Sequence, residues 1–265
     1  MSFSDKKIGN LILSVSDNID TVHAFTTRYG GVSEGIYSSL NLRVYCDDER
    51  ENIEENYKIL CRALDIPFDR LVLSKQIHET NVHIAVEDDA KGIFHVTEIE
   101  RDGLITNVPN LPIIIFTADC IPVLLYDPVS RSVGAVHAGW RGTVSDIVGI
   151  AIEKMCENYG AKPENIHVSI GAGISKCCFE TDGDVPEAVY DAIGENADRF
   201  VFGSGPKYHV DLKGINGYMA GRRGVKPENI DISDECTMCL HDKYWSHRYT
   251  KGSRGTQGAV IMVRG

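Results

Sequence analysis

The stretch from Thr117 to Gly142, TADCIPVLLYDPVSRSVGAVHAGWRG, constrains the fold most, because it predicts two apolar strands joined by a tight turn. The run after Cys120 is rich in strand-forming residues, Asp127-Pro128 supplies the turn, and Ser132 to His137 returns as the second strand. If the turn is centred just after Pro128, Cys120 lies opposite His137, with Cβ atoms roughly 5 Å apart. A thiolate and an imidazole at that separation can bind one Zn²⁺ or copper ion.

A third ligand is expected from LSKQIHETNVHIAV, a strand-like run that holds His78 and His83. An odd separation places these histidines on opposite faces of a strand, so at most one of them joins Cys120 and His137. His78 is preferred, because Gln76 shares its face and could donate a hydrogen bond that orients the ring. Three ligands beside a glycine-rich turn leave a position for water or substrate. The spacing alone is equally compatible with a buried cysteine and a hydrogen-bonded core histidine.

The length and net charge of the chain limit the number of domains and the kinds of partner that we expect. A chain of 265 residues suffices for one domain with a large core, and no linker divides residues 1–265. The net charge of −11 opposes general attraction to nucleic acid or to anionic lipid. No apolar run approaches the roughly 20 residues that span a bilayer, and no signal-peptide pattern follows the N-terminus. We therefore expect a cytoplasmic protein without a membrane partner.

The eight cysteines are expected to be reduced thiols, because the chain is long, lacks an export signal and places Cys177 next to Cys178. Cys236 and Cys239 form a CxxC pair, which is typical of a redox couple or of half a structural zinc site. The sequence has no second CxxC to complete a four-ligand set. We therefore interpret this pair as incidental thiols.

The order of elements predicts an α/β fold with a mixed sheet flanked by helices. An amphipathic helix is expected over 47–64, strands over 71–136 with one central strand in LITNVPNLPIIIFTADC, and a helix capped by Thr143 or Ser145 that ends at Gly160. The segment GAKPENIHVS at Gly160 nearly repeats as GVKPENIDIS at Gly224. Shared helix-stop chemistry explains this similarity, and an internal duplication is the alternative.

Several polar residues near the predicted hairpin and in glycine-rich loops are candidates for chemistry. Asp119 is a general acid or base, or caps a backbone N–H. Arg141, beside free helix N–H groups, could hold a phosphate or carboxylate. Arg28 and Asn41 lie in a glycine-rich loop where a ligand can approach, although such residues more often stabilise the loop.

The basic tail WSHRYTKGSRGTQG holds His247, Arg248 and Arg254 before a last apolar strand, and this segment could close over an anionic group. The common phosphate-loop and nucleophile-elbow motifs are absent from the sequence. Nucleotide binding through those loops and hydrolysis by a serine triad therefore have no sequence support.

Motifs along nearly the whole chain point to one family: FTTRYGGVSEGIYSSLNL, QIH, DGLIT, TADCIPVLLYDP, VHAGWRGT, GAGISKCCFE, and closing CT and SHR. With these motifs the chain resembles the YfiH-like family, labelled multicopper polyphenol oxidoreductases or laccase-domain proteins. The resemblance implies a single α/β/α domain and a zinc site formed by His78, Cys120 and His137. It also implies phosphorolysis of adenosine, inosine, guanosine and methylthioadenosine, together with deamination of adenosine.

The chemistry of these two reactions assigns roles to the candidates. A water activated by Zn²⁺ would attack purine C6, with Asp119 or a nearby histidine moving the proton to the departing ammonia, and Arg141 would hold phosphate for attack at ribose C1′. Substrate contacts are expected from Arg28, Asn41, Gln76 and Arg248. The chain departs from the family pattern at Arg43, Cys46, Glu79 and 253–256, where substrate preference could change.

Two alternatives stay open from the sequence. One is a polyphenol oxidase that uses Cu²⁺ at the same Cys/His site, although nine histidines without an HxH pair argue against a multicopper centre. The other is a non-enzymatic module that is stabilised by a metal and binds a protein partner. The oligomeric state is beyond the sequence.

Overall fold

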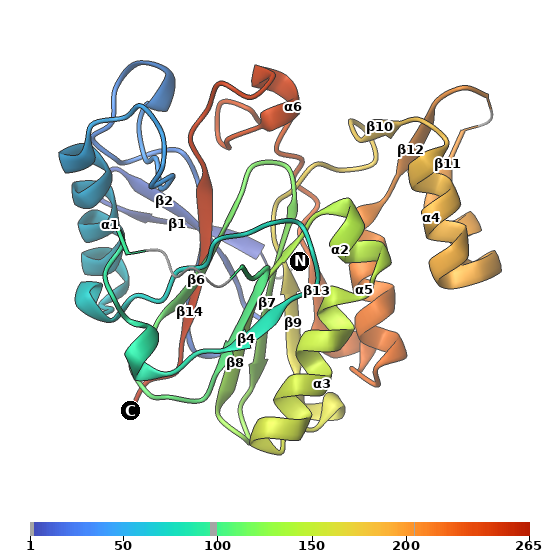
Figure 1. Ribbon diagram of the computed structural model, residues 1–265, viewed down its shortest axis with the longest axis horizontal. Helices are drawn as coiled ribbons and strands as arrows, with labels where there is room; N and C mark the ends of the chain where they lie inside the picture. The colour runs from blue at the N-terminus through green and yellow to red at the C-terminus, as the bar shows by residue number, and fades with distance from the viewer. Residues whose placement is uncertain (1–2, 96–99, 204) are drawn as a thin grey trace.

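Two β-sheets stack face to face in the computed structural model, which describes residues 3–95, 100–203 and 205–265. Helices cover the outer face of each sheet (Figure 1). The predicted mixed α/β fold with flanking helices is confirmed, and its β layer is double. The first sheet is antiparallel and contains, in spatial order, β1 (Phe3–Ile8), β2 (Leu11–Ser16), β3 (Val22–Thr26), β14 (Gln257–Met262) and β6 (Ile113–Thr117).

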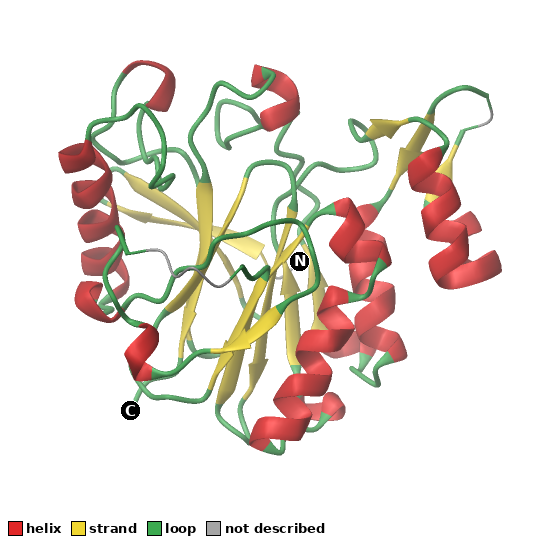
Figure 2. Ribbon diagram, viewed as in Figure 1, coloured by secondary structure: helices red, strands yellow, loops and turns green. Residues whose placement is uncertain are grey.

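The second sheet has six strands and mixed direction, as Figure 2 shows by the strand arrows. Parallel pairs form its two edges and antiparallel pairs its centre. The connection between the parallel neighbours β9 and β13 contains α-helices, which is how such strands are usually joined. In spatial order the strands are β13 (Ile230–Ile232), β9 (His167–Ile170), β7 (Ile121–Asp127), β8 (Ser132–Ala138), β5 (Gly103–Thr106) and β4 (Val82–Ile84).

The central strands β7 and β8 are apolar on both faces because both faces are covered. On β7, Val123 and Leu125 pack against the helices, whereas Leu124 packs against the first sheet. On β8, Val136 faces the helices and Ala135 faces the first sheet. This alternation buries both sets of side chains completely and fixes the strands in register.

The register of this hairpin differs from the prediction by two residues: Pro122, not Cys120, pairs with His137. The turn is centred one residue later than expected, between Val129 and Ser130, because the Asp127 carboxylate accepts the backbone N–H groups of these two residues and holds the loop between Asp127 and Ser132. A shift of two residues keeps every side chain on its predicted face. Cys120 and His137 therefore remain neighbours although their pairing was wrong.

The helices lie on the two outer faces, with a smaller unit beside them. Helix α1 (Arg50–Leu64) covers the first sheet, and α2 (Trp140–Val144), α3 (Ile147–Tyr159) and α5 (Leu212–Arg222) cover the second. Helix α4 (Asp184–Ile193) packs on a small sheet of β10 (Glu180–Thr181), β12 (Tyr208–Val210) and β11 (Val201–Phe202), and α6 (His247–Thr250) is a single turn. No helix in the described part of the chain is long and apolar enough to cross a bilayer.

Two boundaries differ from the predictions. The helix expected after Thr143 or Ser145 is two helices, because α2 begins at Trp140 and Asp146 caps α3 by accepting the N–H of Gly149. The run predicted as one central strand is divided into β5 and β6, which belong to different sheets. Its break falls at Pro109, Asn110 and Pro112, where proline prevents ladder hydrogen bonds.

The two similar segments lie side by side. Each forms a short 3-10 helix, Pro163–Asn165 or Pro227–Asn229, and then a strand, and these strands, β9 and β13, pair in parallel. Both explanations of the similarity, shared helix-stop chemistry and duplication, are compatible with this pairing.

Candidate metal centre and its cavity

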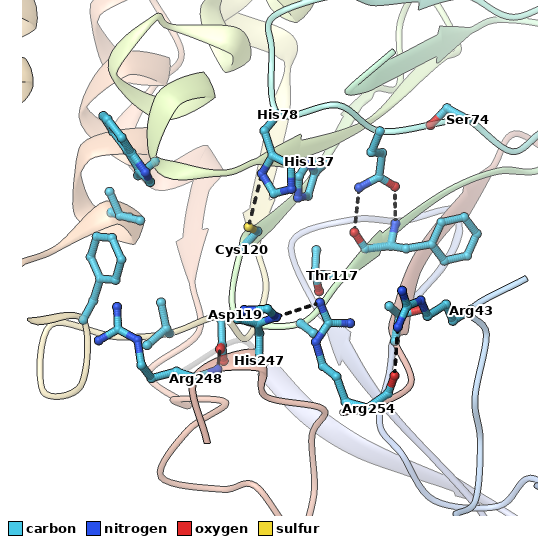
Figure 3. Close-up of a pocket in the computed structure, with 18 residues that line it drawn as sticks. Arg43, Ser74, His78, Thr117, Asp119, Cys120, His137, His247, Arg248 and Arg254 are labelled. Atoms are coloured by element: carbon cyan, nitrogen blue, oxygen red, sulfur yellow. Dashed lines mark hydrogen bonds between the residues drawn. The ribbon is translucent and has the colours of Figure 1, made fainter. Parts of the chain in front are cut away.

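Three side chains meet at one end of the stacked sheets: His78 from the loop before β4, Cys120 from the β6–β7 turn, and His137 near the end of β8. Their ligand atoms lie within 4.8 Å of one another, and Cys120 Sγ is 4.0 Å from His78 Nδ1 (Figure 3). One thiolate and two imidazoles at this spacing match the donor set that binds Zn²⁺ with an open position.

Asp102 holds two of these residues in place. It precedes β5 and lies opposite His137, and its buried carboxylate accepts a 2.7 Å hydrogen bond from His137 Nδ1. The same carboxylate accepts the backbone N–H groups of Ile77, His78 and Glu79 at 2.9–3.1 Å. One carboxylate therefore orients the His137 ring and fixes the loop that presents His78.

Electrostatics favour the charged form of this cluster. Burial raises the pKa of the Asp102 carboxyl, but the hydrogen bonds from His137 and the backbone outweigh it and bring the pKa below its usual range. An ionised carboxylate only accepts, so Nδ1 of His137 carries the proton and Nε2 is directed to the cluster. Burial also raises the pKa of the Cys120 thiol, yet the charge of His137 and hydrogen bonds from both histidines lower it to about 6.

His137 responds in the opposite direction. Burial lowers its pKa, but the Cys120 thiolate and the Asp102 carboxylate raise it to about 9. Without a metal, the pair is therefore thiolate and imidazolium at neutral pH. A divalent cation at this position would replace the imidazolium proton and satisfy the same two anions.

Gly139 makes room for the cluster. A Cβ atom at this position would stand 2.9 Å from His78 Nδ1 and 3.5 Å from Cys120 Sγ. The backbone of Gly139 has φ of −65°, a value open to any residue, so space and not conformation requires the glycine. The close backbone approach therefore supports a site built around these donors.

The route by which His78 was selected from the sequence was wrong, although the residue lies in the cluster. His78 lies in a bend with φ of 65° and not in a strand, whereas His83 on β4 is hydrogen-bonded to Asp89. Gln76 does not contact His78. Its amide accepts from and donates to the backbone of Phe116, which fixes the loop to β6.

A cavity of about 490 Å³ opens over the cluster. Figure 3 shows the three candidate ligands between Arg248 on one side and Arg254 with Arg43 on the other. The wall near Arg248 is apolar and aromatic. The lining residues that the following paragraphs use are Ser74, Asp119, Trp140, Ile174, Phe179, Leu212, His247 and Thr256.

Unpaired polar atoms mark the side of the cavity that holds Arg254. The side-chain atoms Ser74 Oγ, Arg254 Nε and Thr256 Oγ1 are buried and have no hydrogen-bond partner among the described residues. Burial lowers the pKa of Arg254, and the neighbouring Arg43 guanidinium lowers it further. Two guanidinium groups and two hydroxyls in one wall form a site that suits an anion.

Asp119 lies at the base of the cavity in a constrained backbone, with φ of 86°. Both of its oxygens are engaged: Oδ1 accepts the Thr237 hydroxyl and Oδ2 accepts the N–H of Arg248, each at 2.6 Å. The Arg248 guanidinium in turn donates to the carbonyls of Cys178 and Glu180. Asp119 thereby ties α6 to the floor of the cavity.

Three residues proposed from the sequence lie outside the cavity lining. Arg28 donates to the carbonyls of Ser38 and His241 and stacks on Trp245, and Asn41 is buried in contacts within its own loop. Arg141 is exposed, and its guanidinium carbon stacks on Trp140 at 4.2 Å from the ring centre. Arg141 is not among the residues that line the cavity.

Sequence reasoning missed the residue that organises the cluster. Asp102 was present only as the first letter of DGLIT, and the pairing of that segment with the strand that carries His137 becomes visible only in the structure. Ser74 and Phe179 had no comparable signal, because a serine and a phenylalanine are ordinary in any loop.

Comparisons with known proteins identify the family of the chain and agree with its fold. The chain is 31% identical over 252 residues to purine nucleoside phosphorylase YlmD of Bacillus subtilis, covering 94% of this chain and 90% of that one. It is 32% identical to adenosine deaminase RL5 of an unknown prokaryotic organism, covering 89% and 92%. The crystal structure of YfiH from Bacillus licheniformis superposes with a TM-score of 0.93 at 28% identity, covering 99% of each chain. The family model described as multi-copper polyphenol oxidoreductase laccase matches residues 22–264, and the chain belongs to that family.

Proposed function

We propose that this chain is a zinc-dependent purine nucleoside phosphorylase that also deaminates adenosine. The proposed nucleosides are adenosine, inosine, guanosine and methylthioadenosine. One observation carries the proposal: a single cavity joins a Cys/His₂ metal-ligand set to the guanidinium groups of Arg43 and Arg254 and to buried polar atoms that have no partner among the described residues. Relatives named purine nucleoside phosphorylase and adenosine deaminase support both activities.

The metal site would be formed by His78, Cys120 and His137, with Asp102 orienting His137. When bound, Zn²⁺ would supply Lewis-acid polarisation of a substrate oxygen or activation of a water. Binding of the ion would release one proton, from His137, because the Cys120 thiol is already ionised near neutral pH whereas the imidazolium still carries the proton that the ion replaces.

Phosphate is proposed to bind at Arg254, Arg43, Ser74 and Thr256. The guanidinium groups would neutralise the phosphate and the hydroxyls would donate to its oxygens, which would satisfy polar atoms that otherwise lack partners. Held there, one phosphate oxygen attacks ribose C1′ while the glycosidic bond breaks and the purine leaves with the bonding electrons. This assignment replaces Arg141, whose exposed guanidinium is not part of the cavity lining.

The purine is proposed to lie against the apolar wall of Trp140, Ile174, Phe179 and Leu212. Aromatic and aliphatic side chains suit the flat faces of a base and exclude water from the bond that breaks. We propose that Asp119 is a positioning residue, because its two oxygens already hold Thr237 and the backbone of Arg248. Arg248 and Gln76 would border the nucleoside from opposite sides.

The test measures base release and deamination by chromatography, with and without phosphate, on protein of known metal content. Arg254→Gln is expected to raise the KM for phosphate by about tenfold or more, because it removes a charged hydrogen-bond donor. Phosphate-independent deamination should change by less than about twofold. The matched control, Arg141→Gln, should leave both activities near wild type.

Two results would contradict the proposal. One is zinc-loaded protein that releases no base from any of the four nucleosides in the presence of phosphate. The other is copper-loaded protein that consumes oxygen with phenolic substrates while zinc-loaded protein is inactive, which would support the oxidase alternative.

A further inference from the structure

In the described part of the chain, four cysteines form a second cluster, which shares no residue with the cluster of His78, Cys120 and His137. Cys177 and Cys178 come from the turn before β10, and Cys236 and Cys239 come from the CxxC turn after β13. All four are free thiols, and Cys177 and Cys239 are exposed. Cys236 and Cys239 were interpreted as incidental because no second CxxC pair could complete a four-ligand set. The adjacent Cys177 and Cys178 supply these two further ligands.

The spacing of the sulfur atoms fits one metal ion. A tetrahedral ion with metal–sulfur bonds of about 2.3 Å has sulfur–sulfur edges of about 3.8 Å. In this cluster Cys239 Sγ lies 3.6 Å from Cys177 Sγ and 3.4 Å from Cys178 Sγ, and all four atoms lie within 4.8 Å of one another. An iron–sulfur cluster would insert several atoms between the thiolates and needs wider spacing.

The surrounding backbone is arranged to support thiolates. The N–H of Ser175 donates to Cys236 Sγ, and the N–H groups of Met238 and Cys239 are directed at the same sulfur. Such N–H groups stabilise negative charge on a ligand sulfur. The buried ammonium of Lys213 donates to the carbonyls of Ser233 and Glu235, directly before Cys236, and adds positive charge beside the cluster.

We propose that Cys177, Cys178, Cys236 and Cys239 bind a second ion, a structural Zn²⁺ in a closed four-thiolate site. Four protein ligands leave no position for water or substrate, which distinguishes this site from the open site at Cys120. The ion would join two segments that are 62 positions apart, from Cys177 to Cys239. This proposal does not depend on the proposed phosphorylase activity.

The position of this site gives the ion a defined structural effect. Phe179, which lines the cavity, directly follows Cys178, and Thr237, which holds Asp119, lies between the two cysteines of the CxxC turn. The ion would therefore stabilise one wall and the floor of the cavity at once. Its removal should lower thermal stability even in the absence of substrate.

The first experiment counts zinc per chain in full-length protein by elemental analysis after zinc loading and removal of excess metal. We expect two ions in the wild type and one in Cys239→Ser. We also expect one in Cys120→Ser, which loses the open site and keeps the closed one, and none in the double variant. The control Cys156→Ser, a half-buried cysteine on α3 outside both clusters, should keep two.

A second measurement does not require a variant to fold. In zinc-loaded wild type, the exposed Cys177 and Cys239 should react with a thiol reagent at least about tenfold more slowly than after chelation, because a metal-bound thiolate is protected. Co²⁺ in place of zinc should give the strong thiolate-to-metal absorption of a four-sulfur site, and Cys239→Ser should weaken it.

Four outcomes would overturn the proposal. These are no zinc in the wild type, a zinc count that is the same in Cys239→Ser as in the wild type, disulfides among the four cysteines in freshly purified protein, and iron in place of zinc at this site after loading. A failure of nucleoside phosphorolysis would leave the zinc count unchanged, so the two proposals are tested separately.

Discussion

Asp102→Asn tests whether one carboxylate organises the metal centre. The amide oxygen can still accept from His137 Nδ1 and the N–H of His78, but the amide nitrogen would face the N–H groups of Ile77 and Glu79. Two buried donors without an acceptor cost about 1–3 kcal/mol each, so the free energy of unfolding should fall by about 2–6 kcal/mol. Weaker orientation of the ligands should lower zinc affinity about 10–100-fold, or roughly 1.4–2.8 kcal/mol.

The assay combines denaturant unfolding of metal-free protein with competition for zinc against a chelator of known affinity. Asp89→Asn is the matched control, because Asp89 accepts a 2.7 Å hydrogen bond from His83 in a pair of the same kind outside the cavity. It should leave zinc affinity unchanged. A dissociation constant for Asp102→Asn within about threefold of wild type, with unchanged stability, would refute the role of this carboxylate.

Two further predictions concern the same centre. Gly139→Ala should place a methyl group 2.9 Å from His78 Nδ1 and lower zinc affinity by about tenfold or more without unfolding the protein. The control is Gly183→Ala, where the added Cβ meets nothing within 4 Å. This variant should bind zinc as tightly as the wild type in the same competition assay. In metal-free protein, alkylation of Cys120, followed by peptide mass spectrometry, should be slow below and fast above pH about 6, because the reactive thiolate forms as the pH rises through the pKa of the thiol. His137→Gln removes the charge that lowers this pKa and should move the midpoint up by at least about one pH unit; an unmoved midpoint would count against the thiolate–imidazolium pair.

Local pattern predicted the parts of the fold that depend on burial alone. The strand-forming residues on either side of Asp127-Pro128 identified the hairpin, and the side chains of Cys120 and His137 were assigned to the same face of it, as the structure has them. The register was wrong because the Asp127 carboxylate accepts the N–H groups of Val129 and Ser130 and centres the turn on these two residues, one position later than expected.

The site could be predicted only in part, because its residues are brought together by contacts between segments that are far apart in the sequence. Gln76 could be placed near the cluster, but its contact with Phe116 depends on a neighbouring strand that the sequence does not identify. The roles of Asp102 and Ser74 likewise depend on residues that are distant in the sequence: Asp102 accepts hydrogen bonds from His137 and the 77–79 backbone, and Ser74 lines the cavity. The four-cysteine cluster shows this limit most clearly. A search for a second CxxC overlooks the adjacent pair Cys177 and Cys178, which folding brings next to the turn that holds Cys236 and Cys239.

The place of β14 has a consequence for how the chain is made. This strand follows the other four strands of the first sheet in the sequence and pairs with β3 on one side and β6 on the other, so the first sheet remains in two separate pieces until Gln257–Met262 emerges. Until then β3 and β6 present open, apolar edges to other chains, a state prone to aggregation. Arg254 and Thr256, next to β14, reach the cavity only when the strand inserts. Chains truncated before Gln257 should therefore be both inactive and insoluble, because the cavity lining is complete only once β14 has paired with β3 and β6.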